Sequence, residues 1–94
     1  MIIKEHIADA KPVNEIALNF GITHMIEGSY WVVARFLTEN GPQKYFASGP
    51  DVEYLLNKVT KFKDLPDFKG NIYKVHNLKC VPISCNGEYD IKNW

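Results

Sequence analysis

The sequence is poor in several features that would point to a particular kind of protein. It contains only two cysteines, Cys80 and Cys85, and a single arginine, Arg35. It has no apolar run long enough to span a bilayer, and its first residues lack the basic-then-apolar order of a secretory signal. We therefore expect a cytoplasmic protein with reduced thiols, and neither a disulfide-rich secreted domain nor a membrane protein.

Catalytic and cofactor motifs are also missing from the chain. There is no glycine-rich phosphate loop, no HExxH zinc motif and no recognisable pair of catalytic acids. The net charge is zero, with 11 basic and 11 acidic residues, so no overall field attracts nucleic acid or an anionic membrane. These absences predict a protein that is not an enzyme and that carries no cofactor.

The most informative part of the chain is a strand, turn and strand in succession. Residues 30–37 are rich in aromatic and β-branched side chains, which predicts a central strand with apolar residues on both faces. Asn40 and Gly41, followed by Pro42, predict a reversal of the chain. Residues 44–47 are then expected to return as the partner strand.

A helix over residues 50–63 follows directly. Ser48 or Gly49 can cap it, and Asp51 places negative charge at its positive end. Its apolar residues recur at steps of three and four positions, which predicts one buried stripe. The stripe consists of Val52, Leu55, Leu56, Val59 and Phe62.

The segments before this part are shorter and less regular. Residues 12–20 predict a short helix that ends at Gly21. Residues 22–26 predict a strand joined to the central strand, giving a three-stranded meander over about residues 22–48. Residues 1–11 fit a strand or a helix, and we favour a strand.

The C-terminal part predicts one more strand. Residues 71–81 alternate unevenly, which indicates a bulge near Asn77. Asn86-Gly87 predicts a turn before a short segment at 89–91. The chain of 94 residues suits a single domain, 1–94. We predict an α+β fold in which a mostly antiparallel sheet packs against one main helix and the short N-terminal helix.

The short helix also has a DNA-binding interpretation. With Ala17 four residues before Gly21, residues 12–20 resemble the first half of a helix-turn-helix motif. The second half is not matched, because Glu27 and Gly28 stand where the recognition helix should continue and a predicted strand follows. We therefore interpret residues 12–20 as an ordinary helix packed on the sheet.

His76, Cys80 and Cys85 form the pattern that comes nearest to a metal or nucleophile site. The spacing H-x3-C-x4-C matches no zinc knuckle, and a fourth ligand would have to come from His6 or His24. Positions four apart on one strand are separated by about 13 Å, so His76 would not reach Cys80 to activate it. Besides a metal site, a disulfide and two unrelated thiols are the alternatives. We favour two free thiols, with Cys80 packed as a small apolar residue.

Aromatic and basic residues together favour a binding function. Tyrosine and arginine often supply much of the energy of a protein interface, and an open sheet edge can add a strand from a partner or a second copy. Arg35 is a permanent charge on an apolar strand, so it must pair with an acid or meet a ligand, and we favour a structural ion pair. The residues that we select for binding are Arg35, Lys44, Tyr45, Tyr54 and Tyr73.

We therefore predict a small non-enzymatic binding protein that regulates or inhibits a larger protein, with a homodimer as a further arrangement. The alternative is nucleic-acid or nucleotide binding through a sheet face that carries aromatic residues and lysines. The chain has one arginine and ten lysines, a ratio that is typical of AT-rich coding sequences. Small phage genes and low-GC bacteria share this bias, so a phage-encoded inhibitor is one hypothesis.

Overall fold

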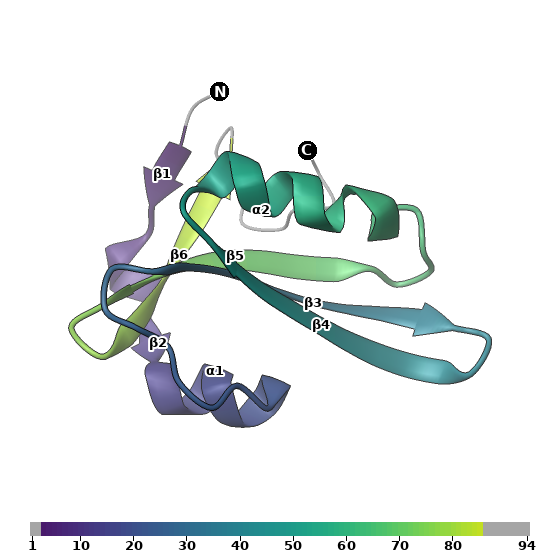
Figure 1. The fold of residues 1–94 in the computed structure, drawn as a ribbon, viewed down its shortest axis with the longest axis horizontal. Coiled ribbons are helices and arrows are strands. Elements are labelled where there is room, and N and C mark those ends of the chain that lie inside the picture. The colour runs from purple at the N-terminus through teal and green to yellow at the C-terminus, as the bar shows by residue number, and fades with distance from the viewer. Residues whose placement is uncertain (1–2, 86–94) are drawn as a thin grey trace.

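A computed structural model describes residues 3–85, the last of them by its backbone alone. The strands are β1 (Ile3–Glu5), β2 (Lys11–Pro12), β3 (Tyr30–Thr38), β4 (Gly41–Gly49), β5 (Lys69–His76) and β6 (Lys79–Cys85), and the helical elements are η1 (Ile7–Asp9), α1 (Val13–Phe20), α2 (Val52–Val59) and η2 (Thr60–Phe62). The strands form one antiparallel sheet in the order β1-β6-β5-β3-β4, with β2 also paired to β6, and α1 and α2 cover opposite faces (Figure 1). This confirms the predicted α+β fold class. No helix in this part of the chain is both long and apolar enough to cross a membrane.

Strand β3 is the centre of the sheet, because β4 pairs with one of its edges and β5 with the other. Its alternate residues contribute to two different cores. Val32 and Ala34 pack under α2, whereas Trp31 and Val33 belong to the core under α1. Helices on both faces explain why this strand is apolar on both of its sides.

The core between α2 and the sheet is the larger of the two. Leu55 and Ile72 have no exposed surface there. The Phe36 ring stacks on Phe62 at 4.8 Å and on Phe68 at 6.5 Å, measured between ring centroids. Aromatic pairs at this separation add to the energy of burial, so this part of the core is well packed.

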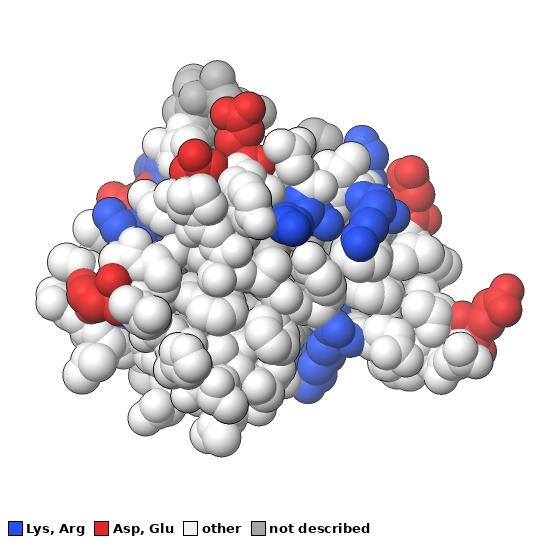
Figure 2. All heavy atoms as spheres, viewed as in Figure 1, with Lys and Arg blue, Asp and Glu red and all other residues white. Residues whose placement is uncertain are grey.

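Helix α2 is shorter than the predicted helix over residues 50–63. It ends at Val59 and continues as the 3₁₀ turn η2. Its cap is Asp51 rather than Ser48 or Gly49, since the Asp51 carboxylate accepts a hydrogen bond of 2.8 Å from the backbone N–H of Tyr54. Glu53 lies in the first turn of α2 and Lys58 in its last, which suits the helix dipole. Figure 2 shows acidic side chains over the beginning of α2 and mostly basic ones over its end.

The predicted strand at residues 22–26 is absent, so the meander over about residues 22–48 is wrong. Strand β5 occupies the edge of β3 that this segment would need, from the pair Tyr30–Lys74 to the pair Arg35–Lys69. Residues 21–29 instead form a loop that buries Ile22 in the core under α1.

Two tight turns also differ from the prediction. Gly41 already pairs with Thr38, so the turn between β3 and β4 consists of Glu39 and Asn40. The expected bulge near Asn77 is a two-residue turn, Asn77-Leu78, between β5 and β6. Both residues have positive φ, 52° and 62°, as in a type I′ turn. This turn reverses the chain and accounts for the uneven alternation of residues 71–81.

The segment before α1 pairs with β6 in two short pieces. Ile3 lies opposite Cys85 and Lys11 lies opposite Cys80. Between them, the His6 Nε2 atom lies 2.7 Å from the hydroxyl of the fully buried Ser84. The strand favoured for residues 1–11 is thus present only in part, because η1 separates β1 from β2. The turn expected at 86–87 and the segment at 89–91 lie outside the described residues.

Candidate functional site

The residues selected from the sequence divide between the two faces of the sheet. Arg35, Lys44 and Tyr73 lie on the α1 face. Tyr45 packs on the other face, with its ring centroid 4.8 Å from that of Phe62. Tyr54 belongs to α2, and the Lys58 ammonium lies 5.1 Å from its ring centroid. The structure brings the first three together and does not bring Tyr45 or Tyr54 to them.

Arg35 is the middle of a row of cations that crosses three neighbouring strands. It lies opposite Lys44 of β4 and opposite Lys69 of β5. Residues directly opposite on adjacent strands point to the same face, with their Cβ atoms about 5 Å apart. We call these residues the basic row, Lys69–Arg35–Lys44.

No carboxylate in the described part of the chain forms an ion pair with the basic row. The ion pair between His76 and Glu27 lies elsewhere, and none among residues 3–84 involves Arg35, Lys44 or Lys69. The structural ion pair favoured for Arg35 is therefore not found in the described part of the chain.

Two members of the basic row contact the end of helix α1. The Arg35 Cζ atom lies 5.3 Å, and the Lys44 Nζ atom 5.6 Å, from the centroid of the Phe20 ring. Lys44 also donates a hydrogen bond of 2.6 Å to the carbonyl of Asn19, one of the acceptors left unpaired at the end of a helix. These contacts position the two cations but bring no carboxylate into contact with them.

The basic row lies between two hollows. One, of about 370 Å³, is enclosed by α1 and the sheet. The other, of about 350 Å³, lies toward the tip of the β3–β4 hairpin, which extends past the end of α1 (Figure 1). Arg35 and Lys69 line both hollows. A ligand can therefore approach the basic row from either side.

We call the hollow beside α1 the α1 cavity. Its polar lining among the described residues consists of Lys11, Glu15, Asn19, Arg35, Lys69, Asn71 and Tyr73. Ile16 and Val33 supply apolar surface. The pKa of Tyr73 is raised, first by burial and then by Cys80 and Glu15, while Arg35 acts against this shift. Its hydroxyl is therefore protonated at neutral pH and can donate a hydrogen bond.

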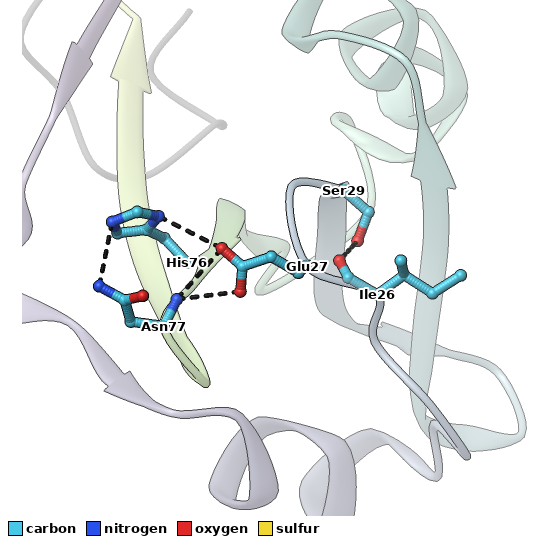
Figure 3. A network of polar contacts seen from close by, with 5 residues as sticks. All are labelled: Ile26, Glu27, Ser29, His76 and Asn77. Carbon is cyan, nitrogen blue, oxygen red and sulfur yellow. Dashed lines mark hydrogen bonds and ion pairs between the residues drawn. The ribbon is translucent and has the colours of Figure 1, made fainter.

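A second polar cluster ties the loop before β3 to the β5–β6 turn (Figure 3). The Glu27 carboxylate accepts a hydrogen bond of 3.0 Å from the backbone N–H of Asn77 and lies 3.3 Å from the His76 Nδ1 atom. The Ser29 hydroxyl donates to the carbonyl of Ile26. Both members of the His76–Glu27 pair are more than half exposed, so it contributes little to stability, and the cluster serves to hold the loop.

The residues considered for nucleophilic or metal chemistry do not form a site in the described part. Cys80 lies opposite Val75 and is fully buried in the core under α1, which confirms that it packs as an apolar residue. Burial raises the pKa of its thiol from 9.0 to about 11, whereas a nucleophilic cysteine needs a lowered pKa. Within residues 3–84, no three His, Cys, Asp or Glu side chains lie close enough together to hold a metal.

Sequence reasoning did not place Lys69 beside Arg35, and it therefore missed the basic row. Arg35 was detectable because a lone charge interrupts an apolar strand, and the predicted hairpin could have placed Lys44 near it. Lys69 gave no such signal, since its position beside Arg35 depends on the register between β3 and β5.

No protein-family model matches the chain, and searches among curated proteins and among solved structures also found no match. The function has to be argued from the site itself.

Proposed function

We propose that this is a small non-enzymatic binding protein that regulates or inhibits a larger protein by binding an acidic segment of that protein at the basic row. The supporting observation is the row of three cations in register, with no ion-paired carboxylate among the described residues. Like charges directly opposite each other destabilise a sheet. An acidic partner would replace this repulsion with attraction.

The surroundings of the basic row favour a protein as the partner. Strand β4 pairs only with β3 among the described strands, so its other edge is open to an added strand. Phe46, on the α1 face of β4, is 42% exposed, and its ring centroid lies 6.0 Å from that of Trp31. A strand added along β4 would place one side chain beside Lys44 and the next on that face beside Phe46. We therefore expect a partner segment with an acidic residue two positions from an apolar one.

Single-stranded nucleic acid is the second candidate, favoured by the same exposed aromatic ring. A base could stack on Phe46 while phosphates meet the neighbouring cations. The net charge of zero argues against it, because nucleic-acid-binding domains are usually basic. The two candidates also differ in salt dependence, since phosphate binding weakens steeply with salt and an interface with an apolar centre does not.

The test is capture from host lysate by the immobilised protein, with and without nuclease. The row variant combines Arg35→Gln, Lys44→Gln and Lys69→Gln. The control variant combines Lys58→Gln, Lys61→Gln and Lys63→Gln, which changes the charge equally near α2. We expect a stoichiometric protein partner that survives nuclease, that is kept by the control variant and lost by the row variant, and whose cross-links map to β4.

Two outcomes would contradict this proposal. Equal loss of capture by both variants would show that general charge, and not the basic row, attracts the partner. Retention that disappears with nuclease would favour the second candidate. In that case, binding of an oligothymidylate probe should show a slope of log K against log salt of about −2, as expected for three phosphate contacts with a single strand.

A further inference from the structure

The α1 cavity contains a buried hydroxyl group without a partner. Tyr73 is only 5% exposed, and no hydrogen bond joins its hydroxyl to any residue in the described part of the chain. Buried tyrosine hydroxyls are normally hydrogen-bonded, so an unpaired one calls for an explanation. Glu15 and Arg35, which both line the cavity, are close enough to influence the ionisation of this hydroxyl. The hydroxyl therefore belongs to the cavity and is available to a ligand.

The charges around the cavity are unevenly distributed. Arg35 and Lys69 lie opposite each other on β3 and β5, and Lys11 adds a third cation from β2. Glu15 is the one acid of the lining. A guanidinium beside an ammonium is a common arrangement for binding a phosphate group, because both donate charge-assisted hydrogen bonds. The cavity thus has one strongly anion-binding side.

Two of the other polar groups suit an alcohol. Tyr73 can donate a hydrogen bond and the Glu15 carboxylate can accept one, and an alcohol hydroxyl does both. Ile16 and Val33 supply apolar surface for a carbon skeleton between the two polar regions. The volume of about 370 Å³ lies in the range of pockets that enclose small molecules.

We propose that the α1 cavity binds a small phosphomonoester that carries a free hydroxyl, with its phosphate at Arg35 and Lys69 and its hydroxyl between Tyr73 and Glu15. This site does not depend on the partner proposed above. Because Arg35 and Lys69 line the cavity and also belong to the basic row, the two ligands would compete for these cations. The small molecule would then release the acidic partner.

The first experiment is an NMR titration of the full chain with ribose 5-phosphate, and separately with ribose and with inorganic phosphate. We expect saturable shifts of the Asn71 and Tyr73 amides, with ribose 5-phosphate binding at least tenfold more tightly than either fragment. Equal affinity for inorganic phosphate and ribose 5-phosphate would overturn the phosphomonoester proposal. Absence of saturable binding at millimolar concentrations of ribose 5-phosphate would overturn it as well.

The variant Tyr73→Phe keeps the ring and removes only the hydroxyl. We expect its affinity for ribose 5-phosphate to fall about five- to tenfold and its melting temperature to stay level or rise. A lower melting temperature would show that the hydroxyl already has a partner in the unliganded protein and would overturn the proposal. Lys58→Gln, near the end of α2, is the control for both measurements.

The two proposals can fail separately. Capture of a partner without binding of ribose 5-phosphate would contradict the cavity proposal alone, and the reverse result would contradict the basic-row proposal alone.

Discussion

The two faces of the sheet use alternate residues of the same strands, yet they differ in packing and in charge. On the α2 face, Phe36 stacks between aromatic rings and Leu55 is fully buried. On the α1 face, the residue next to Phe36 is Arg35, which lines two hollows and lies between two lysines. Helices α1 and α2 have 8 residues each, but α2 continues as η2, whose Phe62 contacts Phe36. We expect the α2 face to supply most of the stability, and the α1 face carries the sites that we propose for ligands.

The largest loss of stability is expected when a large side chain is removed from the core under α2. Leu55→Ala is expected to lower the free energy of unfolding by about 2–5 kcal/mol, because Leu55 has no exposed surface and leaves a cavity. Leu18 of α1 is 85% exposed, so Leu18→Ala should change stability by less than about 0.5 kcal/mol. Urea unfolding followed by circular dichroism measures both. Similar losses in the two variants would show that the α1 helix carries more of the stability than its burial indicates.

Alkaline pH should weaken the protein through the α1 face. The pKa of Cys80 is raised by burial to about 11 in the folded protein, so between pH 9 and 11 the unfolded chain loses a proton that the folded protein keeps. The contribution of this thiol to the free energy of unfolding is therefore fully present below pH 9. It decreases as the pH rises, by roughly 2 kcal/mol at pH 11. The raised pKa of Tyr73 acts in the same direction.

Urea unfolding in reductant at pH 8, 9, 10 and 11 tests this loss. The variant Cys80→Ala should be less stable at pH 8 because of the cavity, but its stability should fall less steeply above pH 9. Parallel curves for the two proteins would contradict the role of the thiol.

Gly49 lies close to helix α2, so a substitution there tests how tightly β4 packs against α2. A Cβ atom on Gly49 would lie 2.3 Å from the Tyr54 Cδ1 atom and 3.2 Å from the Leu55 Cδ2 atom. We expect Gly49→Ala to cost roughly 1–2 kcal/mol of stability, because the Tyr54 ring must move. Thermal unfolding should show a smaller cost in a Tyr54→Ala background. Equal costs in both backgrounds would place the strain elsewhere, and Ser48→Ala, at an exposed neighbouring position, is the control.

The smallest predicted effect on stability is a gain and not a loss. Lys69→Gln is expected to raise stability by about 0.2–0.5 kcal/mol at low salt, because it removes repulsion within the basic row. The gain should disappear at 1 M salt, where such charges are screened. Lys58→Gln should show no gain, since Lys58 lies in the last turn of α2, where a cation is favourable. A loss of stability in Lys69→Gln at low salt would mean that Lys69 has a stabilising partner.

Much of the fold could be predicted because its signals are local. The aromatic and β-branched run at residues 30–37 became β3, the stripe in residues 50–63 became α2 and η2, and Gly21 does end α1 in a left-handed conformation. The strand at residues 22–26 was wrong because the second edge of β3 is filled by β5, which lies far away in the sequence. No pattern within residues 22–26 indicates that β5 pairs with this edge instead.

The candidate site was predictable only in part, for the same reason. Arg35 and Lys44 could be selected from a charge on an apolar strand and from a hairpin. Lys69, Lys11 and Glu15 come to Arg35 from other elements, so only the packing of α1 and the register of β5 bring them together. Tyr45 and Tyr54 were selected for their residue type, which does not show the face of the sheet on which they lie.

The open edge of β4 also affects how copies of this protein meet one another at high concentration. A net charge of zero gives no overall repulsion between copies, and an unpaired strand edge is a template for pairing between chains. Pro42 lacks a backbone N–H, and Lys44 carries a charge in the middle of the edge. The lysine that we assign to partner binding therefore also hinders edge-to-edge aggregation. Neutralising it should appear first as clouding of concentrated samples, while the fold stays intact.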